Sequence, residues 1–328
     1  MKKIFKENYK FMIVLVLIVI TLTINFPYYI DAPGGITNMD EKIEINGYES
    51  VGSFNLSYIK EYRATIPTLI ISLFNKDWNV LKKEDIMFET EDYETYELRD
   101  KILMDESISN AINVAYTKAN KQIKTLSNKL IVTYVDSKAE TDLVVGDEII
   151  SINNKTIINK EEITNIVDSL NIKDKINIKV KNNNQEYDRY AYIINEENSK
   201  KIGILISNLK EYQTTPKVKV NIDKNESGPS GGLITALSIY NSLVKEDITN
   251  GLKIVGTGTI DSNGNIGSIG GVEYKLKSAV KKNAYLFIVP FDENYEQALK
   301  VKKENNYNIE ILGVSTFDEV INYLSEKN

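Results

Sequence analysis

The 328-residue sequence predicts a mixed α/β fold preceded by one apolar helix. Strand and helix patterns alternate from about residue 200 to the end of the chain. A long uncharged segment follows a basic amino terminus, and hydrophobic residues make up 42% of the chain, enough to form a buried core. At about 150 residues per domain, the length corresponds to two domains.

The amino-terminal segment has the pattern of a membrane anchor. Residues 1–10 are rich in lysine, and residues 11–30 carry no charge. Twenty helical residues span roughly 30 Å, the thickness of a bilayer core. A cleaved signal peptide is the alternative, but no small-residue cleavage site follows. We therefore expect an uncleaved single-pass helix over residues 11–30, ended by Pro33-Gly34-Gly35. The basic tail would be cytoplasmic and the remaining residues extracytoplasmic.

Residues 41–124 carry fewer signals. Alternation of apolar and polar residues predicts a strand over residues 52–59, and helical spacing predicts a helix from Ser107 to about Lys121. The acid-rich stretch 84–105 is expected to be a solvated face without a chemical role.

A separate unit is expected over residues 127–196. The patterns predict a strand at 130–135, a turn–strand–turn element with the sequence GDEIISINN at 146–154, a helix at 161–170 and a strand at 175–180. This order resembles a PDZ domain of the form found in exported bacterial proteases. The resemblance implies binding of an extended peptide by strand addition at a sheet edge. A small α+β domain without a ligand is the alternative.

The last unit, residues 200–328, alternates strands and helices. Strands are predicted at 217–222, 252–256, 284–290 and 309–314, and helices at 233–244, 293–304 and 316–325.

The complete absence of histidine and cysteine restricts the possible chemistry. A Ser-His-Asp triad, a thiol nucleophile and metal sites built from histidine or cysteine are excluded. Hydrolysis would need a hydroxyl nucleophile with Lys, Asp or Glu as the proton acceptor. No spaced carboxylate cluster indicates a metal site, and no P-loop motif is present, so we expect no cofactor. The net charge of −6 gives no general attraction to nucleic acid.

The sequence GPSGG at 228–232 lies between a predicted strand and a predicted helix. Ser230 at this place could simply cap the helix. The same place would also put its hydroxyl among unpaired backbone N–H groups, which could stabilise an oxyanion. The pentapeptide alone does not decide between the two interpretations.

Three downstream features accompany this serine: TGTI at 257–260, IGG at 269–271, and Lys275 four residues later. Their order and intervals resemble the proteolytic domain of Lon-type serine proteases. The resemblance implies a Ser-Lys dyad with Ser230 as nucleophile and Lys275 as base, and with Thr257 hydrogen-bonded to the lysine amine. Ser227 stands where many family members have Asp, and Gly231 where Ala is more usual.

With its anchor and PDZ-like unit, the whole chain resembles the membrane-anchored, PDZ-containing Lon-like proteases of bacteria. This resemblance implies that residues 127–196 are inserted into one protease domain formed by residues 41–124 and 200–328. It also implies an ATP-independent endopeptidase at the outer face of the cell membrane, with polypeptide substrates, a peptide ligand for the PDZ-like unit and a possible homo-oligomer. A membrane-tethered peptide-binding scaffold without activity is the alternative.

The dyad places a physical demand on Lys275. A free lysine titrates near 10.4, whereas a useful base needs a pKa of about 7 to 8. Burial could lower the pKa this far, provided that no carboxylate pairs with the amine. We therefore expect Glu273 to point away from the site and Lys277 to lie on the surface.

Overall fold

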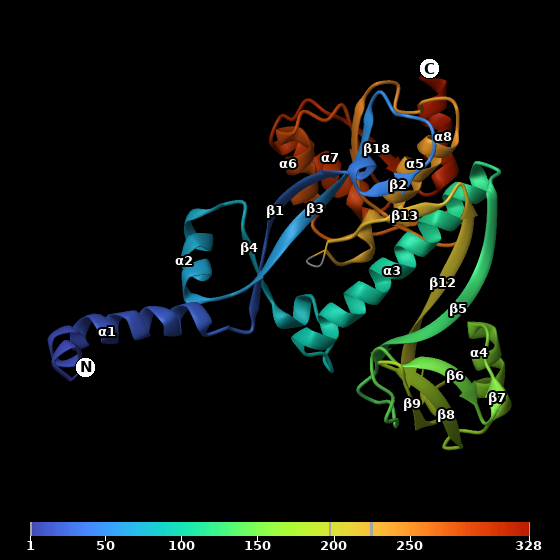
Figure 1. Ribbon diagram of the computed structural model, residues 1–328, viewed down its shortest axis with the longest axis horizontal. Coiled ribbons are helices and arrows are strands. Elements are labelled where there is room, and N and C mark those ends of the chain that lie inside the picture. Colours follow the sequence, from blue (N-terminus) through green and yellow to red (C-terminus); the bar gives the residue numbers. More distant parts are fainter. Residues whose placement is uncertain (1, 197, 224–225, 328) are drawn as a thin grey trace.

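The computed structural model describes residues 2–196, 198–223 and 226–327 (Figure 1). Helix α1 (Lys2–Thr23) extends away from one end of the molecule, and a body of strands and helices lies at the other end. The long helix α3 (Tyr93–Lys118) ends with its carboxyl terminus at this body, and a smaller unit that contains part of a second sheet lies below the body in this view. The chain thus has a mixed α/β architecture, as the sequence predicts.

The main sheet combines strands from both ends of the chain. Its order is β18-β17-β14-β3-β1-β4, in which β14 runs parallel to both β3 and β17, β18 runs parallel to β17, and β1 is antiparallel to β3 and β4. The strands are β1 (Tyr28–Asn38), β3 (Ser53–Arg63), β4 (Asn79–Lys82), β14 (Lys253–Gly256), β17 (Leu286–Pro290) and β18 (Glu310–Val314).

Helices cover both faces of this sheet. Successive side chains of a strand point to opposite faces, so Ile254 and Ile288 pack on one side while Val255 and Phe287 pack on the other. The first side carries α3, α5 (Gly232–Leu243) and α8 (Phe317–Glu326). The second carries α6 (Val272–Lys281) and α7 (Glu293–Glu304). The uninterrupted apolar run in β17 is typical of a strand buried on both faces.

The second sheet is formed by residues that lie between the two halves of the first. Its order is β12-β5-β6-β8-β9, and β7 pairs with β6. It has its own hydrophobic core together with helix α4 (Lys160–Ser169). The strands are β5 (Gln122–Val135), β6 (Glu148–Ile152), β7 (Lys155–Thr156), β8 (Lys175–Asn182), β9 (Gln185–Tyr192) and β12 (Ile204–Thr215). The long strands β5 and β12 pair antiparallel and join the smaller unit to the main body (Figure 1).

Short elements complete the fold. They are α2 (Ile66–Phe74), the hairpin of β10 (Ile194–Glu196) with β11 (Ser199–Lys201), and the pairs of β2 (Ile43–Ile45) with β13 (Val218–Val220) and of β15 (Thr259–Ile260) with β16 (Ile266–Gly267). Single turns of 3-10 helix lie at η1 (Met39–Glu41), η2 (Lys83–Asp85) and η3 (Pro229–Gly231).

Most strands and helices predicted from the sequence are confirmed, with ends that differ by a few residues. The exception in the last unit is the strand expected at 217–222, which is only three residues long, because β13 pairs with the equally short β2. Assignment of residues 41–124, 127–196 and 200–328 to one protease domain and an insertion stays a prediction.

The expected start of the helix at Ser107 is wrong, because α3 begins at Tyr93 with Asp92 as its cap. The acid-rich stretch 84–105 is not uniformly solvated either. Glu91 is buried and lies 3.1 Å from Arg99. Aromatic and charged side chains face the sheet in this half of α3, so the apolar periodicity that marks a helix is weak.

The single membrane-spanning helix expected over residues 11–30 is not found. Helix α1 ends at Thr23, and Tyr28–Ile30 belong to β1, where all three pair with β4 and Tyr29 and Ile30 also pair with β3. Pro33-Gly34-Gly35 lies inside β1 at a bulge instead of ending a helix. Within the ranges that the structure describes, every helix is too short or too polar to cross a membrane.

The insertion is tested by shortening the β5–β12 ladder. Because Ile131 lies opposite Ser207, replacing residues 132–206 by Asn-Gly would close the ladder as a two-residue hairpin. We expect the shortened chain to unfold cooperatively, measured by circular dichroism during heating, since the smaller unit has a core of its own. Loss of any cooperative transition would contradict the prediction.

Candidate active site

Ser230 lies in the 3-10 turn η3 immediately before α5. The backbone of this turn is fixed by two hydrogen bonds to the Ser230 carbonyl, one from the amide of Gly258 at 2.8 Å and one from the hydroxyl of Thr257 at 3.1 Å. A third bond links the Ser107 hydroxyl to the Pro229 carbonyl at 2.8 Å. The main chain around Ser230 is therefore held rigidly from both α3 and β14.

The hydroxyl of Ser230 does not cap the helix. The residue before α5 is Gly231, and no side chain caps this end. The Ser230 hydroxyl has no hydrogen-bond partner among the residues that the structure describes, and the side chain is only half-buried. The capping interpretation of this serine is therefore excluded.

Two glycines of the serine turn, Gly228 and Gly231, occupy positions where a side chain would meet strain or a close contact. Gly228 has φ of +91°, a conformation that favours glycine. At Gly231, a Cβ atom would lie 3.0 Å from the Leu56 side chain of β3. Alanine at position 231 would therefore require the Leu56 side chain to shift by a few tenths of an ångström.

Lys275 and Thr257 lie next to this turn. Thr257 directly follows β14, and Lys275 is in the first turn of α6. The lysine Nζ donates a hydrogen bond of 3.2 Å to Thr257 Oγ1, and this hydroxyl in turn donates to the Ser230 carbonyl. Three residues from three separate segments are thus joined by two consecutive hydrogen bonds, including the one expected between Thr257 and the lysine.

The environment of Lys275 disfavours its charged form. The residue is 3% exposed, and burial lowers the pKa of its amine to about 8, although Asp31 acts in the opposite direction. The amino-terminal end of α6 carries a partial positive charge, which also opposes an ammonium nearby. The Ser57 hydroxyl of β3 donates to the Lys275 carbonyl at 2.9 Å and fixes this turn of the helix.

Neighbouring residues on α6 behave differently from Lys275. Glu273 forms no ion pair with Lys275 within the described part of the chain, as expected; it acts instead on Tyr274, whose pKa is raised by burial and by this carboxylate. Lys277 is not a freely solvated surface lysine. Its amine lies 2.9 Å from Asp77, and the side chain is 23% exposed.

Sequence analysis did not identify Asp31 of β1 as part of the site. The residue is 8% exposed, and burial raises the pKa of its carboxyl to about 6, opposed by Lys275. No ion pair joins the two side chains among the described residues, so the lysine is not neutralised by direct contact. A single charged residue within the run YYIDA was the signal that could have indicated a buried carboxylate.

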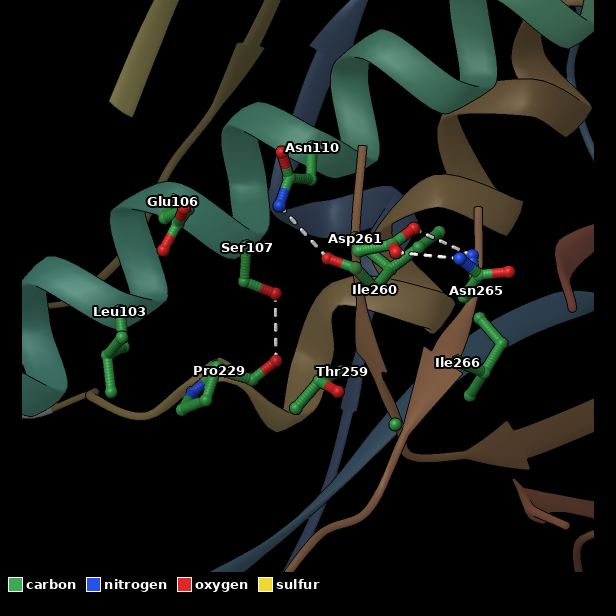
Figure 2. Close-up of a pocket in the computed structure, with 11 residues that line it drawn as sticks. Leu103, Glu106, Ser107, Asn110, Pro229, Thr259, Ile260, Asp261, Asn265 and Ile266 are labelled. Atoms are coloured by element: carbon green, nitrogen blue, oxygen red, sulfur yellow. Dashed lines mark hydrogen bonds between the residues drawn. The ribbon is translucent and has the colours of Figure 1, made fainter. Parts of the chain in front are cut away.

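A cavity of about 330 Å³ lies beside the serine turn, between α3 and the β15–β16 pair (Figure 2). Leu103, Pro229, Ile260 and Ile266 contribute apolar walls. Several of its polar side chains bond to the protein itself: Figure 2 shows Ser107 directed to the Pro229 carbonyl and Asn110 to that of Ile260. The cavity therefore offers mainly apolar surface, although the acidic residues Glu106 and Asp261 also belong to its lining.

Metal binding has no structural support among residues 2–196, 198–223 and 226–327, where no three acidic side chains lie close enough to hold an ion. The expectation that the protein needs no cofactor is not tested by this.

Part of the chain is similar to known proteins. Residues 222–326 match the family model of the Lon protease (S16) C-terminal proteolytic domain. Lon protease 2 of Bacillus subtilis is 38% identical over 94 residues, which cover 29% of this chain and 16% of that protein. Lon protease of Campylobacter jejuni is 32% identical over 99 residues, which cover 30% of this chain and 12% of that protein. The matched segment is thus a small part of each curated relative.

Two solved structures match part of the chain at low sequence identity. The PDZ domain of an SdrC-like protein from Listeria monocytogenes covers 24% of this chain and 85% of its own, with 19% identity and a TM-score of 0.22. The second domain of another Listeria protein covers 25% and 86%, with 20% identity and a TM-score of 0.21. Scores this low carry no argument, so the PDZ-like nature of residues 127–196 stays a prediction. By sequence, the carboxy-terminal part of the chain is similar to the proteolytic domain of Lon proteases, which points to a serine protease.

Proposed function

We propose that the protein is an ATP-independent serine endopeptidase that uses Ser230 as nucleophile and Lys275 as general base. The observation that carries this proposal is the buried amine of Lys275, hydrogen-bonded to Thr257, which itself bonds to the main chain of Ser230. The family match over residues 222–326 supports the same reaction class.

In the proposed reaction, neutral Lys275 takes the hydroxyl proton while Ser230 attacks a peptide carbonyl. Thr257 accepts one amine hydrogen and so orients the lysine lone pair. Backbone N–H groups at the start of α5 stabilise the oxyanion. Lys275 then protonates the leaving amine, and water hydrolyses the acyl-enzyme. Lys275 and Ser230 are not hydrogen-bonded within the described structure, so the two side chains have to approach when substrate binds.

The proposed substrates are flexible polypeptides. The sequence contains no P-loop, so this chain carries no recognisable ATPase that could unfold a substrate. The apolar cavity beside Pro229 is suited to a substrate side chain near the scissile bond. A peptide ligand for residues 127–196 and a homo-oligomer remain further parts of the proposal.

Association with a membrane through α1 is a separate part of the proposal, with the catalytic body on the extracytoplasmic side. The described residues of α1 expose large apolar side chains on all sides, among them Phe11, Leu17 and Leu22. A helix without a polar face is unstable in water unless another apolar phase covers it. We expect the full chain to float with phospholipid vesicles in a density gradient and a chain lacking residues 2–23 to stay at the bottom. Equal flotation of the two chains would exclude this role of α1.

Substitution of the dyad tests the reaction. Ser230→Ala and Lys275→Ala should each reduce cleavage of an unfolded protein by at least about 1,000-fold, because neither group can act alone. Thr257→Val should give a smaller loss of kcat that Thr257→Ser restores, since only the hydroxyl holds the amine.

Matched controls are available close to both residues. Ser227→Ala changes an exposed serine three residues before Ser230, and Lys281→Ala changes an exposed lysine on α6. Both should keep wild-type activity. If Ser230→Ala cleaves as well as the wild type, the peptide-binding scaffold becomes the better account.

The pH dependence follows from the pKa of Lys275. Only the neutral amine accepts a proton, so kcat/KM should rise about tenfold per pH unit below pH 8 and level off above it. Asp31→Asn removes the negative charge that favours the ammonium and should therefore shift this rise to lower pH. A rate profile that is unchanged by Asp31→Asn would show that Asp31 has no influence on the base.

A further inference from the structure

One face of α3 runs alongside the serine turn. Tyr96, Asp100, Leu103 and Ser107 follow each other at intervals of three or four residues, which puts them on the same side of the helix. Leu103 and Ser107 line the apolar cavity beside Pro229. Tyr96 and Asp100 continue this face in the direction of β1 and β3.

Three carboxylates gather along this continuation. The hydroxyl of Tyr96 donates to Glu61 at 3.1 Å, and Glu61 lies opposite Asp31 in the β1–β3 register. Asp100 lies against the serine turn: its carbonyl accepts from the Gly228 amide at 3.2 Å, and a Cβ on Gly228 would be 3.9 Å from its carboxylate. The carboxylates therefore extend from the neighbourhood of Lys275 to that of Ser230.

The described cations near this acidic group balance its negative charge only in part. Arg99 lies 3.8 Å from Asp100 but closer, at 3.1 Å, to Glu91. Lys275, the other nearby cation, has to be neutral for catalysis. Burial raises the pKa of Glu61 to about 7, and the neighbouring carboxylates Asp31 and Asp100 strengthen this effect. Burial also raises the pKa of Asp100, against the opposing influence of Arg99.

Asp31 gives an independent indication of a missing partner. It is more than nine-tenths buried, and its Oδ1 atom has no hydrogen-bond partner in the described part of the chain. Burying a carboxylate oxygen without a hydrogen-bond partner costs free energy, so a ligand that donates a hydrogen bond to Asp31 would remove this cost. Glu61 and Asp100 are only half-buried, so a ligand can reach this group from solvent.

We propose that Asp31, Glu61 and Asp100 form a subsite for a basic side chain of the polypeptide substrate, next to the apolar cavity. This inference rests on the proposed endopeptidase function. The described carboxylates are too far apart to enclose a metal ion together, whereas an ammonium or guanidinium on a long, flexible side chain can reach between them.

The same subsite would couple substrate binding to catalysis. A lysine or arginine of the substrate would supply positive charge close to Asp31, and this charge would oppose protonation of Lys275. The rise of kcat/KM with pH should therefore occur at lower pH for a basic substrate than for a neutral substrate of the same length.

The test first maps, by mass spectrometry, where the full-length protein cuts a denatured protein. Quenched fluorescent peptides based on the preferred site then carry Lys, Met or Glu at each position flanking the cut. We expect one position at which Lys exceeds Met by roughly tenfold in kcat/KM, and Glu to be the poorest.

Glu61→Gln and Asp100→Asn should each bring the Lys-to-Met ratio toward one, whereas Glu94→Gln, an exposed carboxylate on the same helix, should leave it unchanged. The ratio within one variant does not depend on how much of that variant is folded. A wild type that prefers no basic residue, or variants that keep the full ratio, would overturn the subsite while leaving the endopeptidase intact. Equal cleavage by wild type and Ser230→Ala would instead reject the endopeptidase itself.

Discussion

The site depends on one buried lysine amine that receives little compensation for its burial. Nζ of Lys275 donates one hydrogen bond to Thr257, and the closest carboxylate influence, from Asp31, does not become an ion pair. Charging such a group in an apolar surrounding is unfavourable, so its pKa falls toward the range of a general base. Apolar packing around α6 and β14 therefore has to offset the unfavourable free energy of burying this amine.

Strand β14 is the element that connects the two halves of the site. Its side chains pack into the core with α3 and α5 on one face and into the core with α6 and α7 on the other. Thr257 follows the last residue of β14. Its hydroxyl bonds to Lys275 of α6, on one face of the sheet, and to the carbonyl of Ser230, which precedes α5 on the other face. A small shift of one set of helices against the other would therefore separate Lys275 from Ser230, the proposed base and nucleophile.

The carboxylates around the site gather on one side of it. Asp31, Glu61 and Asp100 come from two strands of the main sheet and from α3, and all lie on the side where this helix passes the serine turn. The apolar cavity continues the same face of α3 beyond Leu103. A substrate strand lying along α3 would thus meet a charged and an apolar region in succession, which relates the proposed specificity to the path of one helix.

The amino-acid sequence determined much of this protein by itself. Local periodicity identified most strands and helices of residues 200–328, because such patterns lie within short segments. The resemblance to Lon-type proteases implied Ser230, Thr257 and Lys275 as the site, and the structure places these three residues together. Only the tertiary structure decided the rest. Asp31, Glu61 and Asp100 are far apart in sequence and become neighbours through strand register and helix packing, which no local pattern encodes. The same reason explains why α1 ends at Thr23. Tyr28–Ile30 continue the apolar pattern of the helix, but pairing with β3 and β4 stabilises them as a strand.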